Sequence, residues 1–194
     1  MEVVVSISPT ITSYAPVADL PDEASGARIS TSVPELVLEP LNPADGDVLF
    51  AALAEDEEHF RRFQDWPPIT PEIARAMIND PGHQWSIWYR GQLVGWVLLT
   101  PNVMANGELS SLPPGDAALG YWIIRRHEGK GFVTTSCRAV IEHCVSRDGL
   151  RSVRSGADRD NESSLRVLRR LGFVETERTD RSVTFRLDLP FAID

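Results

Sequence analysis

The amino-acid sequence predicts a mixed α/β (α+β) fold in which helices flank a mostly antiparallel central sheet. Two segments of alternating apolar residues, 85–89 and 93–99, are separated only by a short turn at 90–92, which indicates an antiparallel hairpin. Apolar residues recur instead at helical spacing after Gly131 and after Asn161. With 194 residues, of which 42% are hydrophobic, the chain can form one core without disulfides or metals.

Residues 1–34 are interpreted as an N-terminal arm outside the core, because a short Val-rich segment leads into Ser, Pro, Ala, Asp and Gly. The arm is either flexible or lies at an interface, and a homodimer would provide such an interface. The remaining residues, 35–194, are expected to form a single domain. It begins with a strand at 35–40, which a proline ends, and a helix that Asn42 can cap.

The other elements follow in chain order, each from a local signal. Thr70 and Pro71 form a cap-and-first-turn pair for a helix. A polar loop at 101–116 separates the hairpin from the third strand of the sheet. Gly149 and Gly172 are expected to end the two C-terminal helices. The predicted strands are 35–40, 85–89, 93–99, 117–124, 152–157, 173–176 and 182–187, and the predicted helices are 42–54, 70–78, 132–148 and 161–171.

Charge and composition exclude several classes of function. The net charge of -9 and the pI near 4.9 argue against nucleic acid as a partner, which needs a basic surface. No apolar run approaches the roughly 18 residues of a membrane-spanning helix. No basic residue precedes the first apolar stretch, so we expect no secretory signal and a cytoplasmic location. Cys137 and Cys144 are the only cysteines, which excludes a disulfide scaffold, and both are expected to fill the core. No pair of histidines has the spacing of metal ligands, so no metal is expected.

The charge is unevenly distributed along the chain. Residues 1–124 contain 5 Arg against 17 Asp and Glu, whereas residues 125–194 contain 14 Arg and Lys against 11 Asp and Glu. An acidic half joined to a mildly basic half suits a protein that binds an anionic ligand on one side and a cationic ligand on the other, although chance also produces such a division.

The loop 125–131 has the strongest signal for a binding site. It leaves the predicted strand 117–124 and opens a helix, so its backbone N–H groups and the positive helix end converge where an anion could lie. Gly129 and Gly131 lack Cβ atoms, which allows positive φ angles or the close approach of a ligand. Taken alone, a loop with two glycines is often only a turn, and this one matches neither the P-loop nor the dinucleotide fingerprint.

Four short motifs occur in one order along the chain: Gly120-Tyr121-Trp122-Ile123, Arg126-x-x-Gly129-x-Gly131, Asn161-x-x-Ser164 and Leu171-Gly172-Phe173. Together they resemble the GNAT acetyltransferase superfamily, and in particular its ribosomal-protein alanine N-acetyltransferase (RimJ/RimL-like) branch, over about residues 35–189. The resemblance implies a GNAT-like fold and a bacterial-like N-acyltransferase. Such an enzyme moves an acetyl group directly from acetyl-CoA to a primary amine, either a peptide or protein N-terminus or a small molecule.

The resemblance also implies which residues bind acetyl-CoA, the donor cosubstrate. The loop 126–131 would hold the pyrophosphate on backbone amides, with Lys130 adding charge, and the strand that ends at Ile124 would pair with the pantetheine arm. Asn161 would contact a pantetheine amide and Ser164 would lie near the acetyl sulfur; from residue type alone, both could equally be ordinary helix-start residues. The implied cofactor-binding residues are Trp122, Ile123, Ile124, Arg126, His127, Glu128, Gly129, Lys130, Gly131, Thr134, Asn161 and Ser164.

Two departures from the family pattern leave the catalytic residues open. Many relatives have a tyrosine seven residues after the asparagine, where this chain has Leu168, so Ser164 is the candidate general acid. Relatives also often have a carboxylate where this chain has Ala118. The candidates for the general base are then Asp116, Glu58, another member of the acidic cluster 55–58, or a water relay.

The acceptor site is predicted from the segment after the first helix. Acidic residues 55–58, with Phe60, Phe63 and Trp66, would form an acidic, aromatic-lined mouth for a cationic amine, such as a peptide α-amine, an aminoglycoside-like antibiotic or a polyamine. The same residues could instead be a solvated charge run beside core aromatics. Because the two departures remove catalytic groups, a non-catalytic CoA-binding sensor or interaction module of the same fold is the alternative function.

Overall fold

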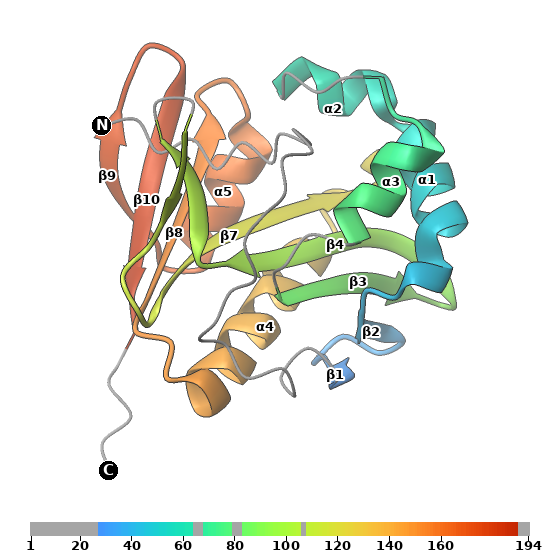
Figure 1. Ribbon diagram of the computed structural model, residues 1–194, viewed down its shortest axis with the longest axis horizontal. Coiled ribbons are helices and arrows are strands. Elements are labelled where there is room, and N and C mark those ends of the chain that lie inside the picture. Colours follow the sequence, from blue (N-terminus) through green and yellow to red (C-terminus); the bar gives the residue numbers. More distant parts are fainter. Residues whose placement is uncertain (1–26, 64–67, 79–82, 106–107, 190–194) are drawn as a thin grey trace.

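A computed structural model describes residues 27–63, 68–78, 83–105 and 108–189 of the chain (Figure 1). Most of the predicted arm, residues 1–26, lies outside the described residues. An eight-stranded sheet in the order β1-β2-β3-β4-β7-β8-β10-β9 forms the centre, and β5 pairs separately with β6. In the large sheet only the β7–β8 pairing is parallel. The predicted fold, mixed with a mostly antiparallel sheet, is therefore confirmed.

The described elements have the following bounds. The strands are β1 (Ile29–Ser30), β2 (Leu36–Pro40), β3 (His83–Tyr89), β4 (Gln92–Thr100), β5 (Asn102–Ala105), β6 (Glu108–Ser111), β7 (Asp116–Ile123), β8 (Ser152–Asp158), β9 (Val174–Arg178) and β10 (Ser182–Asp188). The helices are α1 (Gly46–Glu55), α2 (Glu57–Phe63), α3 (Pro71–Ile78), α4 (Phe132–Asp148) and α5 (Glu162–Arg170), with single helical turns at Pro43–Asp45 and Arg125–His127. Within the described part of the chain, no helix is both long enough and apolar enough to cross a membrane.

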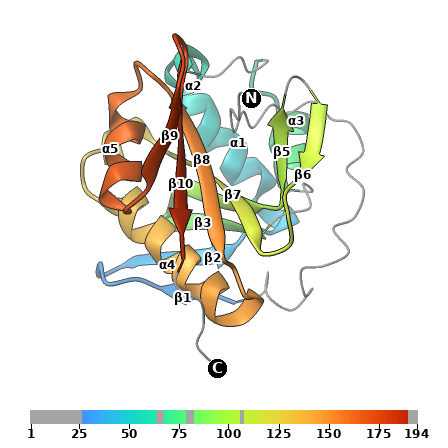
Figure 2. The same ribbon diagram turned by 90° about the vertical axis from the view of Figure 1, so that its left-hand side faces the viewer.

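Helices cover both faces of the sheet, so the molecule has two apolar layers (Figures 1 and 2). Residues of α4 and α5 form one layer with the sheet, and residues of α1 and α3 form the other. The alternation along β4 divides its side chains between them: Val97 and Leu99 enter the α4 layer, whereas Trp96 enters the α1 layer. Cys137 and Cys144 are buried in the α4 layer, as predicted for core cysteines.

Four segments differ from the predictions. The predicted polar loop 101–116 contains the β5–β6 hairpin. The acidic segment continues into α2, which was not predicted; glutamates in its first turn and arginines in its last turn favour this helix through the helix dipole. Ile29 and Ser30, inside the predicted arm, pair with β2 and extend the sheet. Asn42 caps a helical start as predicted, but that start is a separate single turn before α1.

His83, at the start of β3, is expected to make stability depend on pH. Its side chain is buried, and neither ring nitrogen has a hydrogen-bond partner within the described ranges. Burial lowers the pKa of His83; nearby Asp148 opposes this shift, and His143 and Arg147 add to it. The unfolded chain then binds the proton more readily than the folded chain, so stability should fall as the pH drops below about 6.5 and level off below the lowered pKa.

Replacement of His83 by glutamine is expected to reduce this loss of stability, because glutamine does not titrate. Urea unfolding gives the free energy of unfolding of the wild type and the variant at about pH 7.5 and about pH 5.5. The loss of this free energy between the two pH values should be smaller in the variant. An H83Q variant that loses as much stability on acidification as the wild type would show that other groups are responsible.

Candidate cofactor-binding and active site

A pocket opens where β7 and β8 part. The two strands pair only from Asp116–Ala118 to Ser152–Arg154, after which β7 stays paired with β4 and β8 turns away (Figure 1). The Ser155 hydroxyl donates to the Leu119 carbonyl at 2.9 Å, where the strands separate. From Leu119 to Ile123, β7 lines the pocket along the edge that β8 has left. This edge offers backbone donors and acceptors to an extended ligand.

The start of α4 forms another side of the pocket. Gly131 is the N-cap residue, with a φ of 79°, and no side chain caps the helix there. Among the described residues, no side chain thus caps the first N–H groups of α4, and together with the helix dipole these groups favour an anion. Gly129 has a φ of 72°, and apart from the chain neighbours a Cβ atom at either glycine would meet no atom of the described residues within 4 Å. The protein itself thus requires these glycines for their positive φ angles, and it leaves open space beside them.

His127 holds the loop before α4 against the sheet. Its ring is buried and stacks on Phe132 at 6.0 Å between centroids, with the edge of Tyr89 at 6.1 Å. Its Nδ1 lies 3.4 Å from the Nζ of Lys130, whose side chain is exposed. Burial lowers the pKa of His127, and the positive charges of Lys130 and Arg126 lower it further. A neutral imidazole therefore supports the loop at neutral pH.

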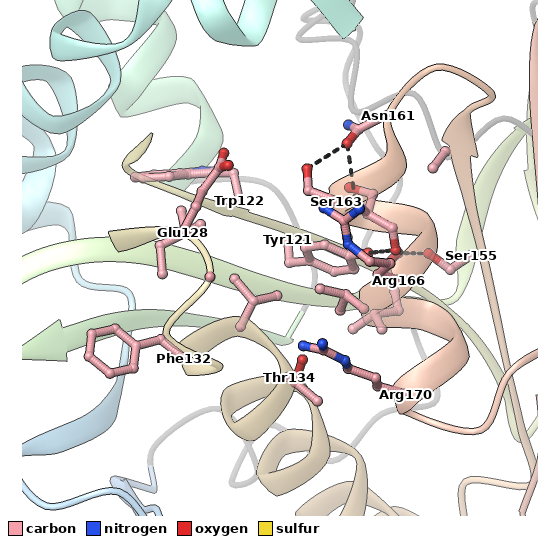
Figure 3. Close-up of a pocket in the computed structure, with 18 of the residues that line it drawn as sticks. Tyr121, Trp122, Glu128, Phe132, Thr134, Ser155, Asn161, Ser163, Arg166 and Arg170 are labelled. Atoms are coloured by element: carbon pink, nitrogen blue, oxygen red, sulfur yellow. Dashed lines mark hydrogen bonds between the residues drawn. The ribbon is translucent and has the colours of Figure 1, made fainter. Parts of the chain in front are cut away.

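The start of α5 forms the opposite wall (Figure 3). The Asn161 Oδ1 accepts hydrogen bonds from the Ser163 hydroxyl at 2.9 Å and from the Ser164 backbone N–H at 3.1 Å. Asn161 is thus the N-cap of α5, and the capping uses only its oxygen, so its amide nitrogen can donate to a ligand. Ser164 lies on the first turn, half-buried, and also lines the pocket.

Tyr121 contributes a phenol that the sequence reasoning did not assign to the site. Its ring lies between β7 and α5, and its hydroxyl donates to the Ser164 carbonyl at 3.3 Å (Figure 3). Burial raises the pKa of Tyr121 well above its ordinary value, so the phenol stays protonated. The α5 position where many relatives have a tyrosine is Leu168, which is fully buried in the core. A tyrosine side chain therefore reaches this region from a different element.

Most of the implied cofactor-binding residues line this one pocket, namely Trp122, Ile123, His127, Glu128, Gly129, Gly131, Thr134, Asn161 and Ser164. Ile124 does not, because it is buried in the layer under α1 and α3. The Arg126 side chain pairs with Glu55 at the end of α1. Sequence reasoning also missed His59 and Asp158 as pocket residues, since the local pattern of α2 and β8 does not show what those elements pack against.

None of the predicted bases lines the pocket with Ser164. Asp116 begins β7, at the end away from the loop, and its carboxylate lies 3.6 Å from Arg186 and 3.8 Å from Arg154. Glu58 is exposed on α2. The acidic segment instead makes structural contacts: Glu55 pairs with Arg126, and Glu57 accepts the Ile69 N–H at 3.1 Å. Trp66 and the side chains of Phe60 and Phe63 lie outside the described residues, so the aromatic mouth stays a prediction.

Comparison with known proteins places the fold in a family. Residues 35–174 match the family model of the acetyltransferase (GNAT) domain. The Bacillus subtilis (strain 168) protein YdaF, named as a candidate ribosomal N-acetyltransferase, is 32% identical over 107 residues, which cover 55% of this chain and 54% of YdaF. The chain thus spans about half the length of this curated relative.

Solved structures share the architecture. RimL, a ribosomal L7/L12 alpha-N-protein acetyltransferase in complex with coenzyme A, matches with a TM-score of 0.71 at 18% identity, over 84% of this chain and 98% of that chain. Mycobacterium smegmatis RimJ, in complex with a CoA disulfide, matches with a TM-score of 0.69 at 17% identity, over 85% of this chain and 88% of that chain. The family match includes β7, the loop, α4 and the start of α5, which together build the pocket. The chain therefore belongs to the GNAT acetyltransferase family.

Proposed function

We propose that this protein is an N-acetyltransferase that moves an acetyl group from acetyl-CoA directly to a primary amine. The observation that carries the proposal is one pocket that joins the uncapped start of α4, at Gly131, to the unpaired edge of β7. The helix start suits a pyrophosphate, and the strand edge suits an extended arm with amide groups. Membership of the GNAT family supports the same activity.

The anionic part of acetyl-CoA is proposed to lie on the α4 side of the pocket. Backbone N–H groups from Gly129 to Thr134 would donate to the pyrophosphate. Arg166 and Arg170, four residues apart on α5, line the same pocket (Figure 3). Guanidinium groups form strong, charge-assisted hydrogen bonds with phosphate oxygens, so these two arginines supply positive charge that a helix start alone does not.

The chemistry is proposed to take place at the fork between β7 and β8. Acetyl-CoA, when bound, supplies a thioester whose carbonyl carbon a neutral amine attacks, with the thiol as leaving group. The Ser164 hydroxyl is proposed to give a proton to the departing sulfur, and a β7 backbone N–H to stabilise the carbonyl oxygen. The hydrogen bond from Tyr121 to the Ser164 carbonyl holds the first turn of α5 in place for this role.

The acceptor is proposed to be the α-amine of a peptide or protein, because YdaF and RimL are both named for ribosomal acceptors. An amine arrives protonated, so a carboxylate near the fork would attract it. Glu128 and Asp158 are the carboxylates that line the described pocket, and Glu128 contacts His59. Asp158 ends β8 and uses one oxygen to accept the Asp160 N–H at 2.8 Å. We therefore propose Asp158 as the residue that attracts the amine.

Replacement of Asp158 by asparagine is expected to raise KM for the amine about fivefold, because the half-exposed charge pair is lost while the turn can still form. The dissociation constant for acetyl-CoA should stay unchanged. Steady-state kinetics with the fastest amine substrate measure this, and Asp160→Asn, outside the pocket, is the matched control. Equal KM values in D158N and D160N would remove Asp158 from the acceptor site.

The proposed function is tested by following free thiol release from acetyl-CoA with a panel of amines. The panel contains peptides with free and with blocked α-amines, an aminoglycoside and a polyamine. Acetyl-CoA should raise the melting temperature by mass action, and only peptides with a free α-amine should release thiol. A raised melting temperature without thiol release from any amine would favour the non-catalytic CoA-binding module. If acetyl-CoA did not raise the melting temperature and no amine released thiol, the proposal would be rejected altogether.

A further inference from the structure

Three polar contacts join the segment between α1 and α2 to the loop before α4. We call residues 55–59 the α1–α2 corner. Glu55, the last residue of α1, pairs with the Arg126 guanidinium. The Asp56 carboxylate accepts the backbone N–H of Arg125. The Nε2 of His59 on α2 lies 3.0 Å from the Oε1 of Glu128.

These contacts give the loop 125–131 two faces with different partners. Arg126 and Glu128 direct their side chains to the α1–α2 corner. Gly129 and Gly131 line the pocket and have open space where a side chain would be. A ligand beside Gly129 and Gly131 would therefore contact the same short loop that Arg126 and Glu128 attach to the α1–α2 corner. The loop and the corner are thus joined at three positions.

The corner also reaches the pocket. His59, on α2, lines the pocket together with Glu128. A loop residue and an α2 residue thus meet at the pocket rim.

We propose that Glu55, Asp56 and His59 are positioning residues that couple occupation of the loop by CoA to the position of α2. This inference rests on the proposed function, since it requires that CoA binds at the loop. Glu55 and Asp56, two of the four acidic residues of the predicted mouth, then bind the loop and not the amine. It also follows that the Arg126 side chain is turned away from the phosphates, so Arg126→Ala should change CoA affinity little. Because coupling is reciprocal, an acceptor that orders α2 strengthens CoA binding.

Amide hydrogen exchange of the full-length protein, with and without saturating CoA, tests the coupling. In the wild type, CoA should slow exchange in the loop 125–134 and, about fivefold, in α2 (residues 57–63). In a Glu55→Gln/Asp56→Asn variant, which lacks two of the three contacts and changes no residue of the pocket, CoA should still slow the loop but should slow α2 less than in the wild type. Asp47→Asn is the matched control, since Asp47 is on α1 and pairs with Arg75 of α3, away from the loop.

Each outcome of the exchange experiment has one meaning. If α2 slows equally in the double variant, or never slows although the loop does, the coupling is rejected and the proposed function stands. If calorimetry shows no CoA binding and neither segment slows, the proposed function fails and the coupling fails with it. The charge-reversed pair Glu55→Arg/Arg126→Glu should restore the part of the α2 response that Glu55→Arg alone removes; failure to restore it would reject the contribution of this pair.

Discussion

Replacing Gly131 with valine is expected to weaken acetyl-CoA binding by about tenfold or more while the domain stays folded. Gly131 has a φ of 79° as the N-cap of α4, a conformation that a β-branched residue strongly disfavours. Apart from its chain neighbours, no atom of the described residues lies within 4 Å of the added Cβ, so its methyl groups would project into open space. Since Gly131 lines the pocket, that space is where the pyrophosphate is proposed to bind. Calorimetric titration with acetyl-CoA measures the loss.

The structure offers a matched control on the same helix. Gly149 ends α4 with a φ of 65°, and a Cβ there would also meet no atom within 4 Å. It does not line the pocket. Gly149→Val should therefore lower the melting temperature to a similar extent without changing acetyl-CoA affinity. The milder pair Gly131→Ala and Gly149→Ala repeats the comparison if valine prevents folding. Equal affinities in the two variants would contradict the assignment of the loop.

Replacing Ser164 with alanine is expected to lower kcat about a hundredfold with acetyl-CoA affinity nearly unchanged, the pattern of a group that acts in the transition state. The hydroxyl lies on the first turn of α5, which its own backbone N–H anchors to Asn161. The substitution leaves that capping bond in place, so the helix start should not move. Steady-state kinetics and a binding titration separate the two constants.

Ser163 provides the control for the serine prediction. Its hydroxyl donates to Asn161 at 2.9 Å, so Ser163→Ala removes a hydroxyl one residue away and loosens the cap. It should lower the melting temperature slightly and leave kcat unchanged. Tyr121→Phe removes the hydrogen bond to the Ser164 carbonyl and should lower kcat less than Ser164→Ala. A rise in the KM for acetyl-CoA with kcat unchanged in S164A would instead make Ser164 a ground-state binding residue.

The order of most elements could be predicted because the longer ones have strong local signals. The alternation of β3 and β4 about the turn at Arg90 and Gly91 indicates the hairpin, and Gly149 ends α4 as its spacing predicts. The hairpin of β5 and β6 and the seven-residue α2 were not predicted. Short elements carry few residues of periodic pattern, and their stability depends on what they pack against.

The candidate site divides in the same way. The signal of the loop from Arg126 to Gly131 is local, since a strand, two glycines and a helix start lie within one short stretch, and the other motifs of the chain were needed to distinguish an anion site from an ordinary turn. The direction in which each side chain points is not determined by the local sequence. Arg126 is turned to α1 by Glu55, and Asp116 is held by Arg154 and Arg186 at the other end of β7. These partners are distant in sequence, so only the pairing of the strands and the docking of the helices select them.

The contact between Tyr121 and Ser164 shows the physical reason most directly. The motifs that contain the two residues were evident in the sequence. They predicted the family, acetyl-CoA as the acetyl donor, and the segments of the chain that form the site. The phenol reaches the Ser164 carbonyl because β7 and β8 separate after Ala118 and α5 packs across the gap. That separation is a property of the whole sheet. A sequence motif specifies which groups are present, whereas long-range strand pairing and helix packing specify which groups meet.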